Sequence, residues 1–129
     1  MLREWVDEAH SRALSKHGGL PGIRDANALE AAMASPRNLW AYGNESDLFI
    51  LSAHLLADVA KCHGYLDGMK RTALSTAVMF LGANGIEVHL DDVKAELYTQ
   101  RAARCTEAKR EKVEMSIAFW LNMASREND

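Results

Sequence analysis

The chain has 129 residues, of which 48% are apolar and 26% are charged, and its formal charge at pH 7 is −3. This composition is typical of a folded protein and not of a disordered one, and we expect residues 1–129 to form a single domain. The small negative charge gives no general attraction for a phosphate backbone, which argues against direct binding to nucleic acid. No apolar run reaches the roughly 18 residues needed to cross a bilayer, and the N-terminal residues lack the apolar core of a signal peptide. We therefore expect no membrane contact and a cytoplasmic location.

The first part of the chain predicts two helices. Apolar residues recur at helical spacing over residues 2–16, and the glycine-rich segment 17–22 ends this helix. Asn27, followed three residues later by a glutamate, resembles a capping box at the start of a short second helix. Pro36 disfavours helical geometry in the residue before it, so the second helix is expected to end near Ser35.

A loop over residues 37–45, rich in Asn, Gly and aromatic residues, is expected to follow the second helix. Ser46 is a good N-cap for a third helix over residues 47–62. His54 on this helix is expected to be a structural histidine with a hydrogen-bond partner rather than a participant in chemistry. Cys62 and Cys105 belong to no CxxC or Cys/His cluster, so both are expected to be reduced and buried.

Three further helices are predicted in the second part of the chain. They run from about residue 69 to 81, from 92 to 103 with Asp91 or Asp92 as the cap, and from 106 to 123. Residues 86–90 alternate in polarity and are compatible with a short extended segment, and the charged tail 125–129 is expected to fray. The sequence therefore predicts an all-α fold of about six helices.

The segment that bears chemical groups is His63-Gly64-Tyr65-Leu66-Asp67-Gly68-Met69-Lys70-Arg71, between two predicted helices. A loop that leads into a helix presents free N–H groups and the positive end of the helix dipole, which together attract anions. A histidine, a carboxylate and two cations beside such a site are the groups needed for magnesium-dependent phosphoryl transfer to a hydroxyl. Each also has an ordinary structural interpretation, since His63 can cap a helix C-terminus, Asp67 can be an N-cap, and Lys70 with Arg71 can form a solvated face.

Several stretches in the right order resemble the Fic/Doc family. HGYLDGMKRTA over residues 63–73 resembles the family signature, and GGLPGIRD at residues 18–25, DLF at 47–49 and ALSTAVMFLGANGIEV at 73–88 are similar to its Doc (death on curing) branch. The resemblance covers roughly residues 10–90. It implies a compact helical bundle around a central helix pair that the motif loop joins.

The resemblance also implies a role for each residue of the motif. His63 would be the general base, Asp67 would hold Mg²⁺ against the phosphates of ATP, and the remaining nucleotide-binding positions would be Gly68, Met69, Lys70 and Arg71. Tyr65 replaces the usual Phe and is expected to anchor the loop in the core. Met69 stands where the motif has Asn, and a thioether donates no hydrogen bond, so weaker stabilisation of the transferring phosphate is expected. Met69 can equally pack inward and fill space.

The position of Leu74 separates two branches of the family. Members that transfer AMP typically have a second Arg there, so Leu74 together with Lys70 is similar to the Doc pattern, which implies transfer of the γ-phosphate. By resemblance the chain would be a type II toxin that acts on a Ser or Thr of a translation elongation factor and binds a Phd-like antitoxin. The alternatives are an AMP-transferring enzyme and a catalytically degenerate binding module. Tyr42, Gly43 and Asn44 lie where the family has a flap that borders the active site, which makes them candidates for substrate docking.

Overall fold

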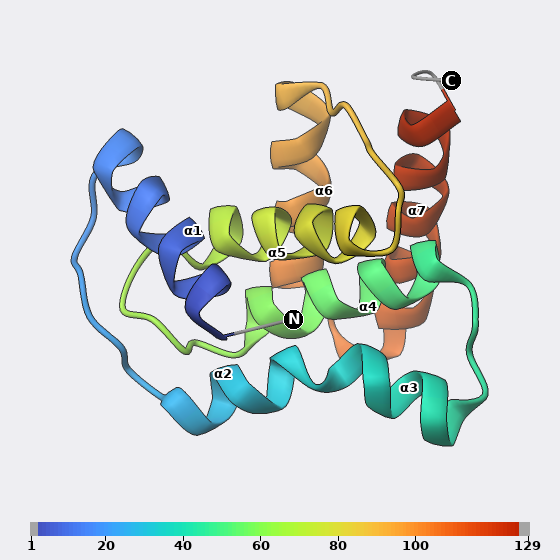
Figure 1. Ribbon diagram of the computed structural model, residues 1–129, viewed down its shortest axis with the longest axis horizontal. Helices are drawn as coiled ribbons and strands as arrows, with labels where there is room; N and C mark the ends of the chain where they lie inside the picture. Colours follow the sequence, from blue (N-terminus) through green and yellow to red (C-terminus); the bar gives the residue numbers. More distant parts are fainter. Residues whose placement is uncertain (1–2, 127–129) are drawn as a thin grey trace.

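The computed structural model of the chain describes residues 3–126, and in this part all regular secondary structure is helical apart from an isolated bridge between Ile23 and Tyr65 (Figure 1). The helices are α1 (Arg3–His17), α2 (Ala26–Met33), α3 (Ser35–Gly43), α4 (Leu48–Lys61), α5 (Met69–Ala83), α6 (Asp92–Arg104) and α7 (Glu107–Arg126). The prediction of an all-α fold is confirmed, with seven helices in place of about six. Leu2 and residues 127–129 of the predicted tail lie outside the described residues.

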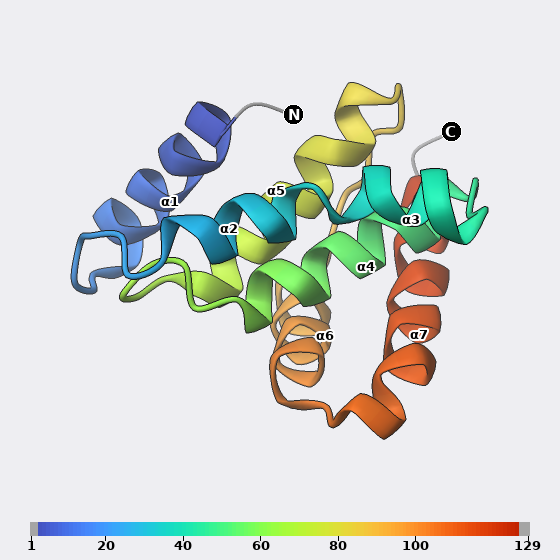
Figure 2. The same ribbon diagram turned by 90° about the horizontal axis from the view of Figure 1, so that it is seen from below.

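Helices α4 and α5 pack against each other at the centre, and between them they contact all the other helices of the described chain. The core is built mainly from α4, whose fully buried apolar residues recur at helical spacing, and from the alanine-rich face of α5. Small residues such as Ala53, Ala57, Ala73 and Ala77 allow close approach of the two helices, and Leu55, Leu56 and Leu81 fill the remaining space. Helices α6 and α7 lie on one side of this pair and α1 to α3 on the other (Figures 1 and 2).

Residues 37–45 are not the predicted loop. Pro36 occupies the first turn of α3, where its missing N–H costs nothing and its fixed φ favours a helix, so the chain stops α2 and at once starts another helix. Asn44 ends α3 with a left-handed φ of 57°. Pro36 was correctly predicted to end the second helix, α2, but it also stands in the first turn of α3.

Two predicted caps are also wrong by one or two residues. Asp25, rather than Asn27, caps α2 by accepting the N–H of Ala28, and Asp47, rather than Ser46, caps α4. An aspartate carboxylate one turn ahead of free N–H groups is the stronger acceptor, because its charge also complements the helix dipole. Asp91 caps α6 as predicted.

The remaining expectations concern the two cysteines, the connection between α5 and α6, and the membrane. Cys62 and Cys105 are free thiols as expected, but both are only partly buried. Residues 86–90 form an irregular connection from α5 to α6. In the described part of the chain, no helix has the length and apolar character required to cross a lipid bilayer.

Candidate active site

The motif loop, residues 63–68, joins the end of α4 to the start of α5. Cys62 caps α4, and His63 follows with a left-handed φ of 52°, a conformation that turns the chain sharply away from the helix. The His63 side chain is exposed to solvent. A histidine in this conformation stores about 1–2 kcal/mol of backbone strain that a glycine would not. The strain falls on the residue that the family resemblance predicts to be the general base.

Residues 18–25 run alongside the motif loop and hold it with backbone hydrogen bonds. The N–H of Leu66 donates to the carbonyl of Gly22 (3.2 Å), and the N–H of Arg24 donates to the carbonyl of Gly64 (2.8 Å). Asp67 receives a further bond, because its Oδ2 accepts the N–H of Leu20 at 2.8 Å. Figures 1 and 2 both show the two segments side by side at the end of the α4–α5 pair.

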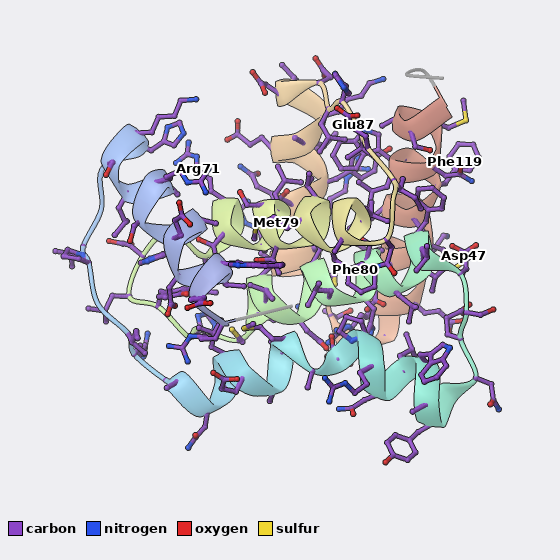
Figure 3. All side chains as sticks on the ribbon, in the orientation of Figure 1. Asp47, Arg71, Met79, Phe80, Glu87 and Phe119 are labelled. Atoms are coloured by element: carbon purple, nitrogen blue, oxygen red, sulfur yellow. The ribbon has the colours of Figure 1, made fainter. Side chains whose placement is uncertain are left out.

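The start of α5 has the features expected of an anion site. Gly68 is the N-cap residue with a left-handed φ of 78°, and no side chain caps the first N–H groups of the helix with a hydrogen bond. Lys70 and Arg71 in the first turn are exposed. Arg71 extends toward the C-terminal half of α1 (Figure 3). Desolvation, together with the positive charge of Arg71, lowers the pKa of His17 at the end of that helix. Free N–H groups, the helix dipole and these cations all favour a bound anion.

Met69 is turned into the loop and away from solvent. Its Sδ lies 3.2 Å from the backbone nitrogen of Tyr65, whose N–H points at the sulfur. The side chain is partly buried and packs against apolar residues of both core clusters. The space-filling interpretation of this residue is therefore confirmed for its side chain.

Tyr65 anchors the loop in the core, as predicted. Its side chain is 3% exposed and packs between Val6 and Leu29. Its hydroxyl donates a short hydrogen bond to the carboxylate of Asp7, and burial together with this bond raises the tyrosine pKa. His10, to which the sequence analysis assigned no role, stacks on the ring.

An open hollow of about 450 Å³ lies beside His63. It is lined by His63, Cys62, Arg24 and Asp25, so the exposed imidazole shares a concave surface with a guanidinium and a carboxylate. This volume falls within the range of small-ligand pockets. Arg24 was missed by the sequence analysis, because it precedes the motif by about 40 residues and only the pairing of Ile23 with Tyr65 brings it there.

The predicted flap is not part of this site. Tyr42 and Gly43 form the last turn of α3 and Asn44 caps it, immediately before α4 begins. The motif loop follows the other end of α4, which is roughly 20 Å away for a helix of this length. The prediction that these three residues border the active site is wrong, because α3 extends along the central pair toward the start of α4 (Figure 1).

His54 has the structural role that was predicted for it. Its Nδ1 lies 2.7 Å from Oε1 of Glu114 on α7, and its Nε2 lies 3.4 Å from Oδ2 of Asp58. Arg110 joins the same cluster through Nε, 2.5 Å from Glu114, and through a short bond to Asp58. The hydrogen bond with Glu114 raises the pKa of His54, and although burial raises the pKa of Glu114, its bonds to His54 and Arg110 produce a net decrease. The cluster ties α4 to α7.

Comparison with known proteins shows the family of the chain. Residues 2–81 match the sequence model of the Fic/DOC family, and the chain belongs to this family. The chain is 40% identical over 79 residues to "Protein kinase doc" of Escherichia phage P1, in an alignment covering 61% of this chain and 63% of the phage protein. It is 38% identical over 76 residues to "Toxin Doc" of Mycolicibacterium smegmatis (strain ATCC 700084 / mc(2)155), covering 57% of this chain and 58% of that protein. The aligned region therefore spans about three fifths of these relatives.

Proposed function

We propose that the chain is the toxin of a type II toxin–antitoxin module and transfers the γ-phosphate of ATP to a Ser or Thr hydroxyl of a translation elongation factor. The observation that carries the proposal is the segment 63–71, which presents an exposed imidazole, an exposed carboxylate and two exposed cations at the start of a helix that no side chain caps. The names of the relatives, "Protein kinase doc" and "Toxin Doc", support phosphoryl transfer and a toxic outcome. A cytoplasmic location belongs to the same proposal.

The reaction assigns one task to each residue. His63 takes the proton from the incoming hydroxyl, whose oxygen attacks the γ-phosphorus while the bond to the bridging oxygen breaks and ADP leaves. Lys70, Arg71 and the first N–H groups of α5 bind the phosphate oxygens and stabilise the charge that spreads over them. Gly68 allows the phosphates to approach the backbone.

The residues present are suited to Mg²⁺ and ATP. Mg²⁺ in nucleotide sites commonly keeps several waters and takes only one or two carboxylates besides the phosphates, and Asp67 supplies one exposed carboxylate with Oδ2 already oriented by Leu20. When bound there, Mg²⁺ neutralises charge on the phosphates. Asp67 would hold the ion through its carboxylate, which is exposed.

Phosphate transfer is favoured over AMP transfer by the residue at position 74. Leu74 is partly buried and packs against the main core cluster, so its side chain offers no charge to the outer phosphates. The cations of the site are then Lys70 and Arg71 of the first turn, and the nucleotide is bound in the orientation that presents the γ-phosphate.

A catalytically degenerate binding module is the second candidate, and Met69 is the observation that favours it. Its sulfur accepts the Tyr65 N–H and cannot donate to a phosphate. If the Asn of the motif supplies an essential donor, this chain would retain the fold and the antitoxin contact but turn over slowly. The antitoxin itself is proposed to be Phd-like, with a flexible segment that folds as a helix on the toxin.

The test is a pair of transfer assays with purified elongation factor, one with γ-labelled and one with α-labelled ATP. We expect label from the γ-position only, and its loss in His63→Ala. The variant Met69→Asn keeps an acceptor for the Tyr65 N–H and adds a donor, so it should transfer at least as fast as the parent chain.

Each other outcome has a definite meaning. Label from the α-position would replace the kinase by an AMP transferase. Activity in Met69→Asn alone would show that the chemistry is inherited but disabled in this chain. No label from either protein, together with no binding of ATP and Mg²⁺, would contradict the proposal and leave the binding module.

A further inference from the structure

His10 of α1 lies against three residues of the motif loop, Tyr65, Asp67 and Gly68. Its Nε2 lies 2.7 Å from the carbonyl oxygen of Asp67, and its ring stacks on Tyr65 with the ring centroids 3.7 Å apart and the planes 7° from parallel. A Cβ placed on Gly68 would lie 3.3 Å from Cδ2 of His10, so the imidazole also touches the backbone there. The side chain is only 5% exposed. Because a carbonyl oxygen only accepts, Nε2 carries the hydrogen of the bond to Asp67.

Other residues on the same face of α1 also contact the loop. Asp7, one turn before His10, accepts the Tyr65 hydroxyl and is itself held by Nε of Arg3 at 3.1 Å. Leu14, one turn after His10, lies against Gly68. Arg3, Asp7, His10 and Leu14 are spaced four, three and four residues apart, which places them in one row on a helix. Helix α1 thus supports the loop at Tyr65, Asp67 and Gly68, whereas the His63 side chain is exposed to solvent.

Asp67 is consequently held at two points. Its carbonyl accepts from His10, and its Oδ2 accepts the N–H of Leu20. With the backbone and one carboxylate oxygen both fixed, the direction of the remaining oxygen is fixed as well. Loss of the His10 bond would release one of the two points that hold Asp67.

From this arrangement we infer that His10 is a positioning residue, which orients the Asp67 carboxylate for Mg²⁺ through its hydrogen bond to the Asp67 carbonyl. The inference rests on the proposed function, since it concerns the metal-binding step of the same site. Outer partners of metal ligands typically contribute about 10- to 100-fold to metal affinity. If His10 only filled space in the core, its replacement would change the affinity for ATP equally with and without Mg²⁺.

The experiment compares the full chain with three variants. His10→Phe keeps a ring for stacking on Tyr65 but removes the donor, and His10→Gln replaces the ring but keeps an N–H donor. His89→Phe is the matched control, because His89 is exposed and its recorded contact is with Glu87. The measurements are ATP binding by calorimetry with and without MgCl₂, and amide NMR order parameters of the loop without ligand.

We expect His10→Phe to raise the MgCl₂ concentration for half-maximal ATP binding by about 10-fold or more, with the affinity for Mg²⁺-free ATP unchanged. His10→Gln should recover most of this loss, and His89→Phe should match the parent chain. In NMR, His10→Phe should lower the order parameters of Asp67 and Gly68. An unchanged Mg²⁺ dependence, or an equal loss of affinity with and without Mg²⁺, would overturn the inference.

Two further outcomes can be distinguished from a failure of the inference about His10. If the parent chain binds no ATP at all, the proposed function fails. The NMR order parameters then test the positioning role of His10 by themselves. Equal order parameters in His10→Phe and His89→Phe would reject that role. If His10→Phe does not fold, His10→Gln decides. A near-parental Mg²⁺ dependence in that variant supports the hydrogen bond as the cause, and a 10-fold loss despite the retained donor contradicts it.

Discussion

Replacing His63 by glycine should stabilise the protein while it removes the general base. His63 has a φ of 52°, a conformation that costs a residue with a side chain about 1–2 kcal/mol and glycine almost nothing. Glycine also has more conformational freedom in the unfolded chain, which reduces this gain in the free energy of unfolding by about 0.4–1 kcal/mol. The His63 side chain is exposed, so its removal costs few contacts. The free energy of unfolding should therefore rise by about 0.5–1 kcal/mol, or the melting temperature by about 2–4 °C.

Alanine at the same position separates the two effects. His63→Ala removes the imidazole but keeps the strained conformation, so its stability should stay close to that of the parent chain. Urea unfolding followed by tryptophan fluorescence measures the difference between the two variants, and the γ-label assay should find no transfer by either. If His63→Gly is no more stable than His63→Ala, the strain argument is wrong, and if either still transfers phosphate, His63 is not the base.

Two other perturbations test the supports of the site and of the core. Gly19→Ala places a Cβ 2.9 Å from Cδ2 of Leu14 at a φ of 123°, and it should lower the free energy of unfolding by about 1–3 kcal/mol. Gly18→Ala places its Cβ in an open environment at a φ of 79°, and it should cost clearly less in the same urea assay. Equal losses would show that the contact with α1 is unimportant. The hydrogen bond to Glu114 raises the pKa of His54 above its ordinary 6.5, so the stability that it contributes is complete below pH 6.5 and is lost as the pH rises through the raised pKa. His54→Gln should therefore flatten the decline of the urea midpoint as the pH rises above 6.5, and an unchanged slope would refute this assignment.

Local patterns in the sequence were sufficient for most of the helices and for the motif loop. Apolar residues at helical spacing, glycine-rich breaks and capping residues act over a few positions, so α1, α4, α5, α6 and α7 begin and end within a few residues of the predicted bounds. His63, Asp67, Gly68, Lys70 and Arg71 occur within one short segment, and their proximity needs no knowledge of the fold. The anchoring of Tyr65 in the core was predicted from the family resemblance, in which an aromatic residue stands at this position.

Tertiary structure alone decided which distant residues complete and support the site. His10 meets Asp67 across 57 positions of sequence and His54 meets Glu114 across 60, and no local pattern encodes such pairs. The end of α3 lies far from the motif loop because helix α4 separates them, although Tyr42 and His63 are both exposed loop or helix-end residues. Met69 turns inward because a backbone N–H is there to be satisfied. Spacing along the chain determines local structure, whereas the packing of helices determines which side chains meet, since burial and hydrogen bonding are satisfied only in the assembled core.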